Sequence, residues 1–181
     1  IVAAGVSRGA KVRRCVAGTR WTWDGVVFRT LYPFDATYGE PGVKSNNLSC
    51  VIRVSSAAAS VLLTGDIEAR AEGALIARDA PALRSDVLVV PHHGSRSSST
   101  PEFIAAVHPA AVVYTPGYRN RFGHPHPAVV ARYAAAGVRA YRTDEDGAVA
   151  FDLEQDAKTP PRLERQADRR YWRDAPPAAA R

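Results

Sequence analysis

Short apolar runs separated by turn residues fill the first part of the chain. Aromatic and β-branched residues from Trp21 to Phe28 flank Asp24-Gly25, a dipeptide typical of two-residue hairpin turns. Residues 50–54 and 60–63 form two further apolar runs, joined by small residues. With another strand expected over residues 11–16, this pattern predicts a strand-rich first third.

Helices alternate with strands in the second half. Apolar residues recur at helical spacing from Ile67 to Ala77, a region that predicts a helix. Proline at the first position opens the helices expected over residues 101–107 and 127–136. The further expected strands are 86–90, 111–114, 138–141 and 148–153. Such alternation, combined with hairpins, predicts a layered α/β domain.

Length and composition fit one folded domain. The chain has 181 residues, of which 46% are hydrophobic, enough to build a core. We expect the domain to span residues 1–154, and the Arg- and Pro-rich stretch 155–181 to be a disordered tail. No apolar run approaches the roughly 18 residues that a membrane helix needs, so this piece by itself is expected to be soluble. Because it begins at Ile1, in what reads as the middle of an element, we expect a fragment of a longer protein.

Charge and cysteines restrict the functional classes only slightly. The net charge of +6 is concentrated in arginines near both ends, which favours polyanions such as nucleic acid but equally fits solvated surface arginines. Cys15 and Cys50 have no CxxC spacing, which excludes a zinc ribbon. We expect no disulfide, and expect each cysteine to be a small buried apolar residue.

The most informative residues follow two apolar runs. Asp66 comes just after the strand expected at 60–63, and His92 and His93 come just after the strand at 86–90. Carboxylate oxygens and imidazole nitrogens are ligands that zinc or manganese prefers. Asp66 has an alternative role as a helix N-cap, and either histidine as a core residue. In an extended segment the two imidazoles point to opposite sides. We therefore expect one to bind the metal and the other to contact the groups that surround the metal ligands, or the substrate.

Two polar loops and one polar turn are candidates for substrate binding. Hydroxyls and amides from Ser95 onward suit an anion, although a capped loop has the same composition. The loop 117–127 contains arginine, asparagine and histidine, which suits phosphate binding or proton donation. The alternative is that the histidine and asparagine form hydrogen bonds within the loop itself. The candidate substrate-binding residues are Asn46, Asn47, Ser49, Ser95, Asn120, Arg121 and His126, with His124 as a catalytic candidate beside Asp66, His92 and His93.

Four motifs together resemble a known family. They are Asn46-Asn47-x-Ser49, Leu63-Thr64-Gly65-Asp66-Ile67-Glu68, Val90-Pro91-His92-His93-Gly94-Ser95 and Asn120-Arg121-Phe122-Gly123-His124-Pro125. In order and spacing they resemble the C-terminal half of the metallo-β-lactamase-type domain of ComEC competence proteins, over about residues 1–153. The resemblance implies the C-terminal portion only of an αββα sandwich. It also implies a parent membrane protein whose polytopic channel takes single-stranded DNA into bacteria, with this domain thought to act as a metal-dependent nuclease.

Carried over to this sequence, the resemblance makes Asp66 the bridging aspartate, and His92 or His93 a late ligand, of a site for two zinc or manganese ions. Asn120 and His124 fall on its rim loop. The family's H-x-H-x-D-H motif is absent from these residues. We therefore expect metal binding to be weak or absent in this chain, and the hydrolase to need the upstream half of the domain. The alternative is a truncated or degenerate, non-catalytic domain that binds DNA through its Arg-rich ends or packs against a membrane channel.

Overall fold

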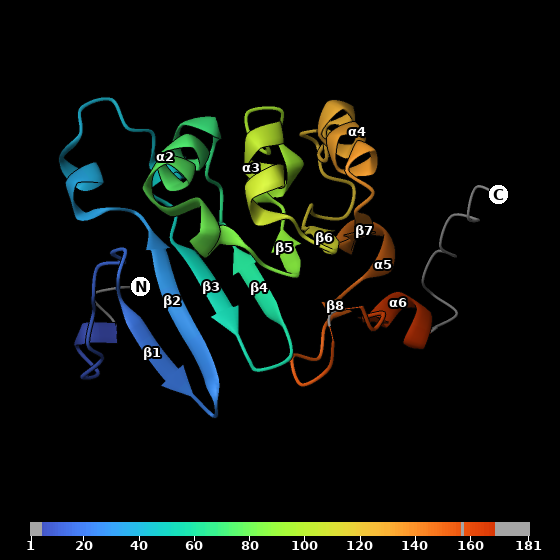
Figure 1. Ribbon diagram of the computed structural model, residues 1–181, viewed down its shortest axis with the longest axis horizontal. Helices are drawn as coiled ribbons and strands as arrows, with labels where there is room; N and C mark the ends of the chain where they lie inside the picture. Colours follow the sequence, from blue (N-terminus) through green and yellow to red (C-terminus); the bar gives the residue numbers. More distant parts are fainter. Residues whose placement is uncertain (1–4, 157, 169–181) are drawn as a thin grey trace.

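The computed structural model describes residues 5–156 and 158–168. Its centre is a mixed sheet of seven strands arranged in sequence order (Figure 1). The strands are β1 (Arg20–Trp23), β2 (Val26–Tyr32), β3 (Val51–Ser55), β4 (Ser60–Leu63), β5 (Val87–Val89), β6 (Ala111–Tyr114) and β7 (Arg139–Arg142).

The sheet changes character at β4. Strands β1 to β4 are antiparallel neighbours, whereas β4 to β7 run parallel and are connected through helices. The predicted hairpin is confirmed: β1 pairs with β2 across Asp24 and Gly25, whose φ angles are 48° and 79°. Positive φ at both central residues is what a type I′ turn requires.

Three helices cover one face of the sheet. They are α2 (Ala69–Asp79), α3 (Pro101–Val107) and α4 (Pro127–Ala135). Leu62 and Leu88 of the sheet pack with Leu75, Phe103 and Tyr133 of these helices in one buried core. The shorter elements are α5 (Thr143–Asp146), α6 (Glu164–Ala167) and the 3-10 turns η1 (Asp35–Gly39), η2 (Ser45–Leu48), η3 (Ala80–Leu83) and η4 (Pro91–Gly94).

Residues 5–156 and 158–168 cover the opposite face of the sheet only in part. Val87 and Val113 pack there against Val149, Phe151 and Leu153 of the segment that follows α5. At the other edge, the side chains of Trp21 and Trp23 are exposed, Trp23 to 69%. The predicted α/β class is confirmed, because a sheet with helices on one face is the layer that forms half of an αββα sandwich.

The prediction for the cysteines was wrong. Cys15 and Cys50 form a disulfide with their Cα atoms 5.9 Å apart. The chain before β1 folds back beside the end of β2, where the amide of Ala17 donates to the carbonyl of Pro33, and this brings Cys15 to the start of β3. The prediction of a strand over residues 11–16 was also wrong, because this segment pairs with no strand and regular pairing starts only at Arg20.

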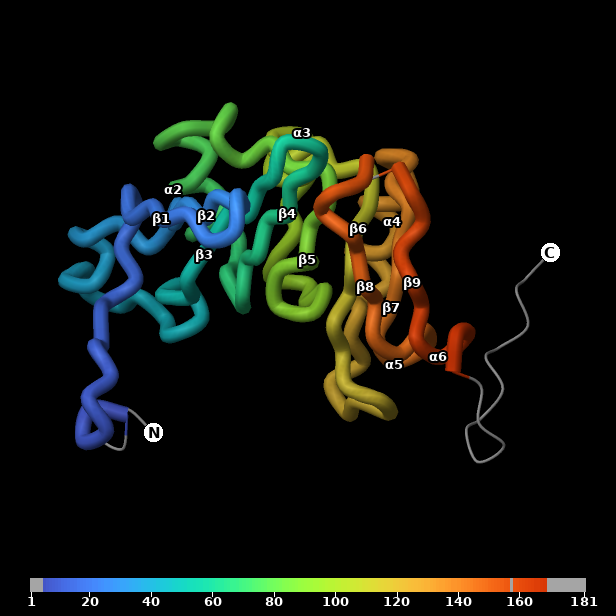
Figure 2. The backbone as a smooth tube through the Cα atoms, turned by 90° about the horizontal axis from the view of Figure 1, so that it is seen from below, coloured from blue at the N-terminus to red at the C-terminus, as the bar shows by residue number. Residues whose placement is uncertain are grey.

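Ordered structure continues past the predicted boundary at residue 154. Strand β8 (Val149–Ala150) pairs antiparallel with β9 (Arg162–Leu163), and Figure 2 shows this segment running beside β6 and β7. Residues 169–181, the remainder of the expected tail, lie outside the described residues. Within 5–156 and 158–168, the helices are all too short or too polar to cross a membrane.

Candidate functional site

The polar residues that follow β4, β5 and β6 lie at one edge of the sheet. Because parallel strands end at the same edge, the turns after them meet there. The hydroxyl of Thr64 donates to the carbonyl of Val89 over 2.7 Å, and the amide of His92 donates to the carbonyl of Gly65 over 3.0 Å. These two hydrogen bonds hold the turn with Asp66 against the turn with the two histidines.

Both histidines have left-handed backbone conformations. The φ angles are 48° at His92 and 55° at His93, and Gly94 follows with a φ of 83°. A Cβ atom at Gly94 would lie 2.7 Å from Cβ of Pro125 and 3.0 Å from Cδ1 of Tyr114, so the site requires glycine. The segment is therefore a tight turn instead of the extended chain assumed from the sequence, yet the two imidazoles still face different partners.

Asp66 and His93 approach each other directly. The Nε2 atom of His93 lies 3.4 Å from Oδ1 of Asp66, and both side chains are less than half exposed. On its other side, His93 Nδ1 lies 3.0 Å from the hydroxyl of Thr115, the residue after β6. Thr115 therefore fixes the orientation of the imidazole while Nε2 faces the carboxylate.

The spacing between Asp66 and His93 suits a shared cation. Two donors each 2.0–2.2 Å from a tetrahedral zinc ion lie about 3.4 Å apart, which matches the separation in this structure. A catalytic zinc ion takes about three protein ligands. Asp66 and His93 thus fit part of a metal shell, and the remaining donors would come from elsewhere. The predicted alternative role of Asp66 as a helix cap is absent, because α2 begins after Glu68 and Glu68 is its N-cap residue.

His92 lies deeper than His93 and contacts a different set of groups. Its Nε2 atom is 3.4 Å from the side-chain nitrogen of Asn46, and its ring lies edge-on to that of His124 with centroids 5.9 Å apart. Its Nδ1 atom is buried, has no hydrogen-bond partner among the described residues, and lies 3.8 Å from Oε1 of Glu68. The structure therefore brings Asn46, His92 and His124 together beside Asp66 and His93.

Glu68 connects three loops of the site. Its carboxylate accepts hydrogen bonds from Lys44 and from the hydroxyl of Ser97, each over 3.1 Å. Its amide donates to Oδ1 of Asn47 over 2.9 Å. Burial of the carboxylate acts to raise its pKa, but the hydrogen bonds from Lys44 and Ser97 together prevail, so the pKa of Glu68 is lowered.

Sequence reasoning missed Glu68 and Thr115 as site residues. Glu68 belongs to the same short polar turn as Asp66 and lies only two positions further along. Thr115 directly follows the strand at 111–114, just as Asp66 and His92 follow theirs. Applying the rule that parallel strands end at one edge to this third strand would have found Thr115.

Asn47 and Ser49 support the backbone of the site. Asn47 is buried and accepts the amide of Glu68, and the hydroxyl of Ser49 accepts the amide of Asp66 over 3.1 Å. Ser95 lies beside Ser97, with the two hydroxyl oxygens 3.2 Å apart. These three candidates lie at the site, and Asn47 and Ser49 act there through the backbone of residues 66–68.

The loop 117–127 contributes fewer groups than its composition suggests. Asn120 exchanges two hydrogen bonds with the backbone of His124, and Nδ1 of His126 accepts the amide of Ala128 at the start of α4. Arg121 lies over the ring of Phe122, 5.3 Å from its centroid. Only His124 reaches the cluster among these predicted residues, and burial, followed by the nearby His92 and His93, lowers its pKa. The substrate-binding roles of Asn120, Arg121 and His126 stay predictions.

Comparison with known proteins gives relatives for most of the chain. It is 38% identical to competence protein ComA of Neisseria gonorrhoeae over 164 residues, which covers 91% of this chain and 23% of the relative. It is 35% identical to ComE operon protein 3 of Bacillus subtilis over 106 residues, 59% of this chain and 14% of the relative. The chain thus spans less than a quarter of the length of either protein.

Comparisons with protein-family models and with solved structures are less informative about this chain. No protein-family model matches the chain. Among solved structures, it is similar to a putative zinc-dependent hydrolase of the metallo-β-lactamase superfamily from Thermotoga maritima, with 15% identity and a TM-score of 0.34 over 57% of this chain and 48% of that one. A likeness this distant decides nothing about the site. The competence proteins are much nearer in sequence, and they confirm what the four motifs predicted: this chain is a relative of part of the ComEC-type competence proteins.

Proposed function

We propose that this chain is part of a metal-dependent hydrolase domain, a phosphodiesterase or nuclease, in a bacterial DNA-uptake protein. The observation that carries the proposal is the 3.4 Å approach of His93 Nε2 to Asp66 Oδ1 at the ends of two neighbouring parallel strands. This pair has the donor types and the spacing that zinc or manganese requires. Its exposure leaves the pair accessible to a substrate and to ligands from another part of the polypeptide.

Each residue near the pair has a part in this proposal. Asp66 and His93 hold the metal, and Thr115 orients His93 through the contact at Nδ1. A bound ion would polarise a phosphoryl oxygen and generate hydroxide from water near neutral pH. Asn46 orients the ring of His92. The imidazoles of His92 and His124 lie side by side, and the phosphodiester would lie next to them.

The chain alone is proposed to be a poor catalyst. Asp66 and His93 supply two donors, whereas catalytic zinc sites use three protein ligands. In the proposal, the remaining ligands come from the upstream half of the domain, and a polytopic membrane channel of the same protein delivers DNA. Metal binding by residues 1–181 should therefore be weak, and hydrolysis should require the longer protein.

Metal binding tests the proposal directly. Mn²⁺ is titrated into the chain while NMR line broadening is followed, a readout that detects weak binding without any turnover. We expect selective broadening around Asp66 and His93, lost in Asp66→Asn and His93→Gln. His108→Gln is the matched control, because His108 ends α3 and lies outside the site. Unchanged broadening in both site variants would show that the pair is not a metal site.

Hydrolysis tests the rest of the proposal. Cleavage of a single-stranded oligonucleotide is measured for the chain and for a longer protein that includes the upstream half, with Mn²⁺ or Zn²⁺ and with chelator. We expect cleavage only by the longer protein, lost with chelator and in Asp66→Asn. Robust cleavage by residues 1–181 that Asp66→Ala abolishes would contradict the proposed weakness of the chain. DNA binding without cleavage in the longer protein would favour the non-catalytic alternative.

A further inference from the structure

Three arginines occupy directly paired positions across three neighbouring strands. Arg20 of β1 pairs with Arg29 of β2, and Arg29 pairs with Arg53 of β3. Paired residues of adjacent strands project from the same face of a sheet. Arg53 is also paired with Leu62, a core residue beneath the helices, so this arginine row projects from the face that carries the helices.

The described structure gives the arginine row few compensating contacts. Like charges directly opposite one another on neighbouring strands repel. Arg29 has one acidic contact in the described structure, its guanidinium lying 3.6 Å from Asp79, and both of these side chains are about half exposed. Nε of Arg53 donates to the carbonyl of Arg84, which brings a further arginine to the end of the row. A high arginine content alone would place arginines at scattered surface positions. It does not explain why three arginines occupy directly paired positions on neighbouring strands.

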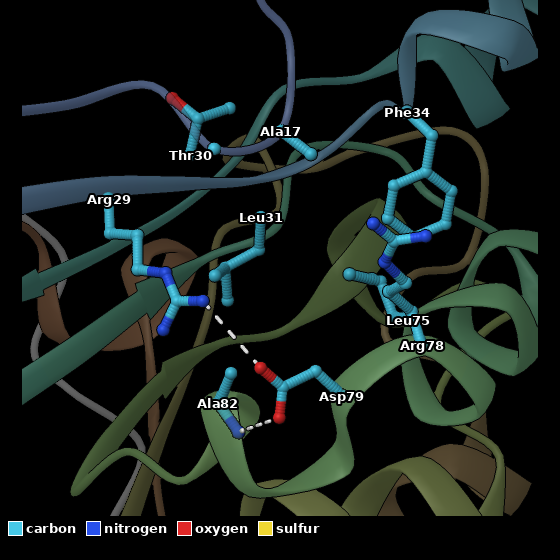
Figure 3. A pocket seen from close by; sticks show the side chains of 10 residues that line it. Ala17, Arg29, Thr30, Leu31, Phe34, Leu75, Arg78, Asp79 and Ala82 are labelled. Carbon is cyan, nitrogen blue, oxygen red and sulfur yellow. Dashed lines mark hydrogen bonds and ion pairs between the residues drawn. The ribbon is translucent and has the colours of Figure 1, made fainter.

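A cavity of about 300 Å³ lies beside the row (Figure 3). Arg29 and Leu31 of β2 line one side, and Leu75, Arg78 and Asp79 of α2 line the other. The guanidinium of Arg78 lies over the ring of Phe34, 5.5 Å from its centroid, so this stacked pair and the guanidinium of Arg29 border the same space. None of the residues of the candidate metal site lines this cavity.

We propose that the arginine row and this cavity bind a single nucleic-acid strand. The arginines contact successive phosphates, and the cavity with Phe34 and Arg78 receives a base. Proteins that bind single strands combine a positive groove with aromatic or guanidinium surfaces for stacking. A paired base has no free face to offer such a cavity, which favours a single strand over a duplex. The cavity is recessed between β2 and α2, where a flexible strand can enter but a flat lipid surface cannot.

Removal of the negative charge of Asp79 is expected to strengthen binding of the strand. Its Oδ2 atom pairs with Arg29, and its Oδ1 accepts the amide of Ala82 over 3.3 Å at the start of η3. Asp79→Asn removes the negative charge but keeps an oxygen for the amide of Ala82. If phosphate binds Arg29, this variant should bind the strand several-fold more tightly. Damage to the fold would weaken binding instead, so it cannot imitate this result.

The experiment measures fluorescence anisotropy of a labelled oligothymidylate with the full chain, in chelator and over a series of salt concentrations. The first variant replaces the three arginines of the row by glutamine. The matched control removes the same charge at the opposite end of the molecule, through Arg139→Gln, Arg162→Gln and Arg165→Gln. We expect the row variant to raise Kd about tenfold or more, and to reduce the slope of log K against log salt by about 2, since each phosphate contact contributes about 0.7 for single strands.

Several outcomes would overturn the proposal. Equal losses in the row variant and the control would mean that only the net charge matters. Unchanged or weaker binding by Asp79→Asn would exclude phosphate at Arg29. Binding to anionic vesicles that depends on the row, without binding to the oligonucleotide, would identify a lipid surface as the partner. Because the chelator removes metals, this test is independent of the proposed hydrolase.

Discussion

The carboxylate of Glu68 and the imidazole of His92 lie 3.8 Å apart, measured from Oε1 to a buried Nδ1 atom that has no hydrogen-bond partner in the part of the chain that the structure describes. Glu68 also accepts from Lys44 and Ser97. Lys44 and Ser97 are exposed, so water replaces part of what Glu68→Ala removes, and we expect this variant to lower the free energy of unfolding by about 1–2 kcal/mol. Glu68→Gln retains an acceptor for Ser97 and should cost less.

Chemical denaturation in chelator measures both Glu68 variants without interference from metals. Lys44→Ala is the matched control, because it removes only the most exposed partner, whose ion pair contributes at most about 1 kcal/mol. Equal effects of Glu68→Ala and Lys44→Ala would mean that Glu68 has no role beyond this ion pair.

Gly94 is the position where the site tolerates a side chain least. In Gly94→Ala, the new methyl group would meet Pro125 and Tyr114 at a residue whose φ is 83°. We expect the free energy of unfolding to fall by about 2–4 kcal/mol, from backbone strain and overpacking combined. The measurement is urea unfolding followed by circular dichroism.

Gly73 provides the comparison for Gly94. It lies inside α2, and a Cβ atom there would meet nothing within 4 Å. Gly73→Ala should therefore stabilise the chain by about 0.5–1 kcal/mol, since alanine is the better helix former. If both substitutions had the same sign, the close approach of Pro125 to Gly94 would be unimportant.

Glu72 should make stability fall as the pH rises. Burial raises the pKa of this carboxyl, although it accepts the amides of Ser99 and Thr100. Because its pKa is higher in the folded than in the unfolded state, the folded state binds the proton more tightly. Its contribution is complete below pH 4.5 and is lost as the pH rises through the folded-state pKa.

The Tm of the unmodified chain and of Glu72→Gln, measured from about pH 4 to 7, tests this assignment. We expect the unmodified chain to lose Tm relative to the variant as the pH rises, because glutamine does not titrate. A Tm difference that is constant over this range would show that Glu72 has the same pKa in both states.

The disulfide should account for a sizeable part of the stability of the chain. Cys15 and Cys50 close a loop with a sequence separation of 35 residues. A loop of this length corresponds to about 3–4 kcal/mol in the chain-entropy description. The double variant Cys15→Ser, Cys50→Ser should lose this amount in urea unfolding. Reduction of the unmodified chain serves as its control and should give the same midpoint, whereas unchanged stability in both would exclude the bond.

Local chemistry made part of this structure predictable. The Asp24-Gly25 turn and the parallel strands that end before Asp66 and His92 follow from turn preference and apolar patterning, which act over a few residues. The Cys15–Cys50 bond was missed because it depends on how the chain before β1 folds back past Pro33. The number of residues between the two cysteines does not reveal this fold. The left-handed backbone at His92 and His93 was missed for a related reason. The turn that contains them packs at Gly94 against Tyr114 and Pro125, and contacts between residues so distant in sequence cannot be predicted from local patterning.

The two-residue turn at Asp24 and Gly25 has an effect far from itself. A side chain changes face with every step along a strand, so a shift of β1 by one residue would exchange Arg20 for a neighbour that faces the other way. Arg20 would then project from the face that Trp21 and Trp23 occupy in this structure, and Trp21 would lie beside Arg29. The geometry of one small turn thereby decides which side of the molecule is aromatic and which is cationic.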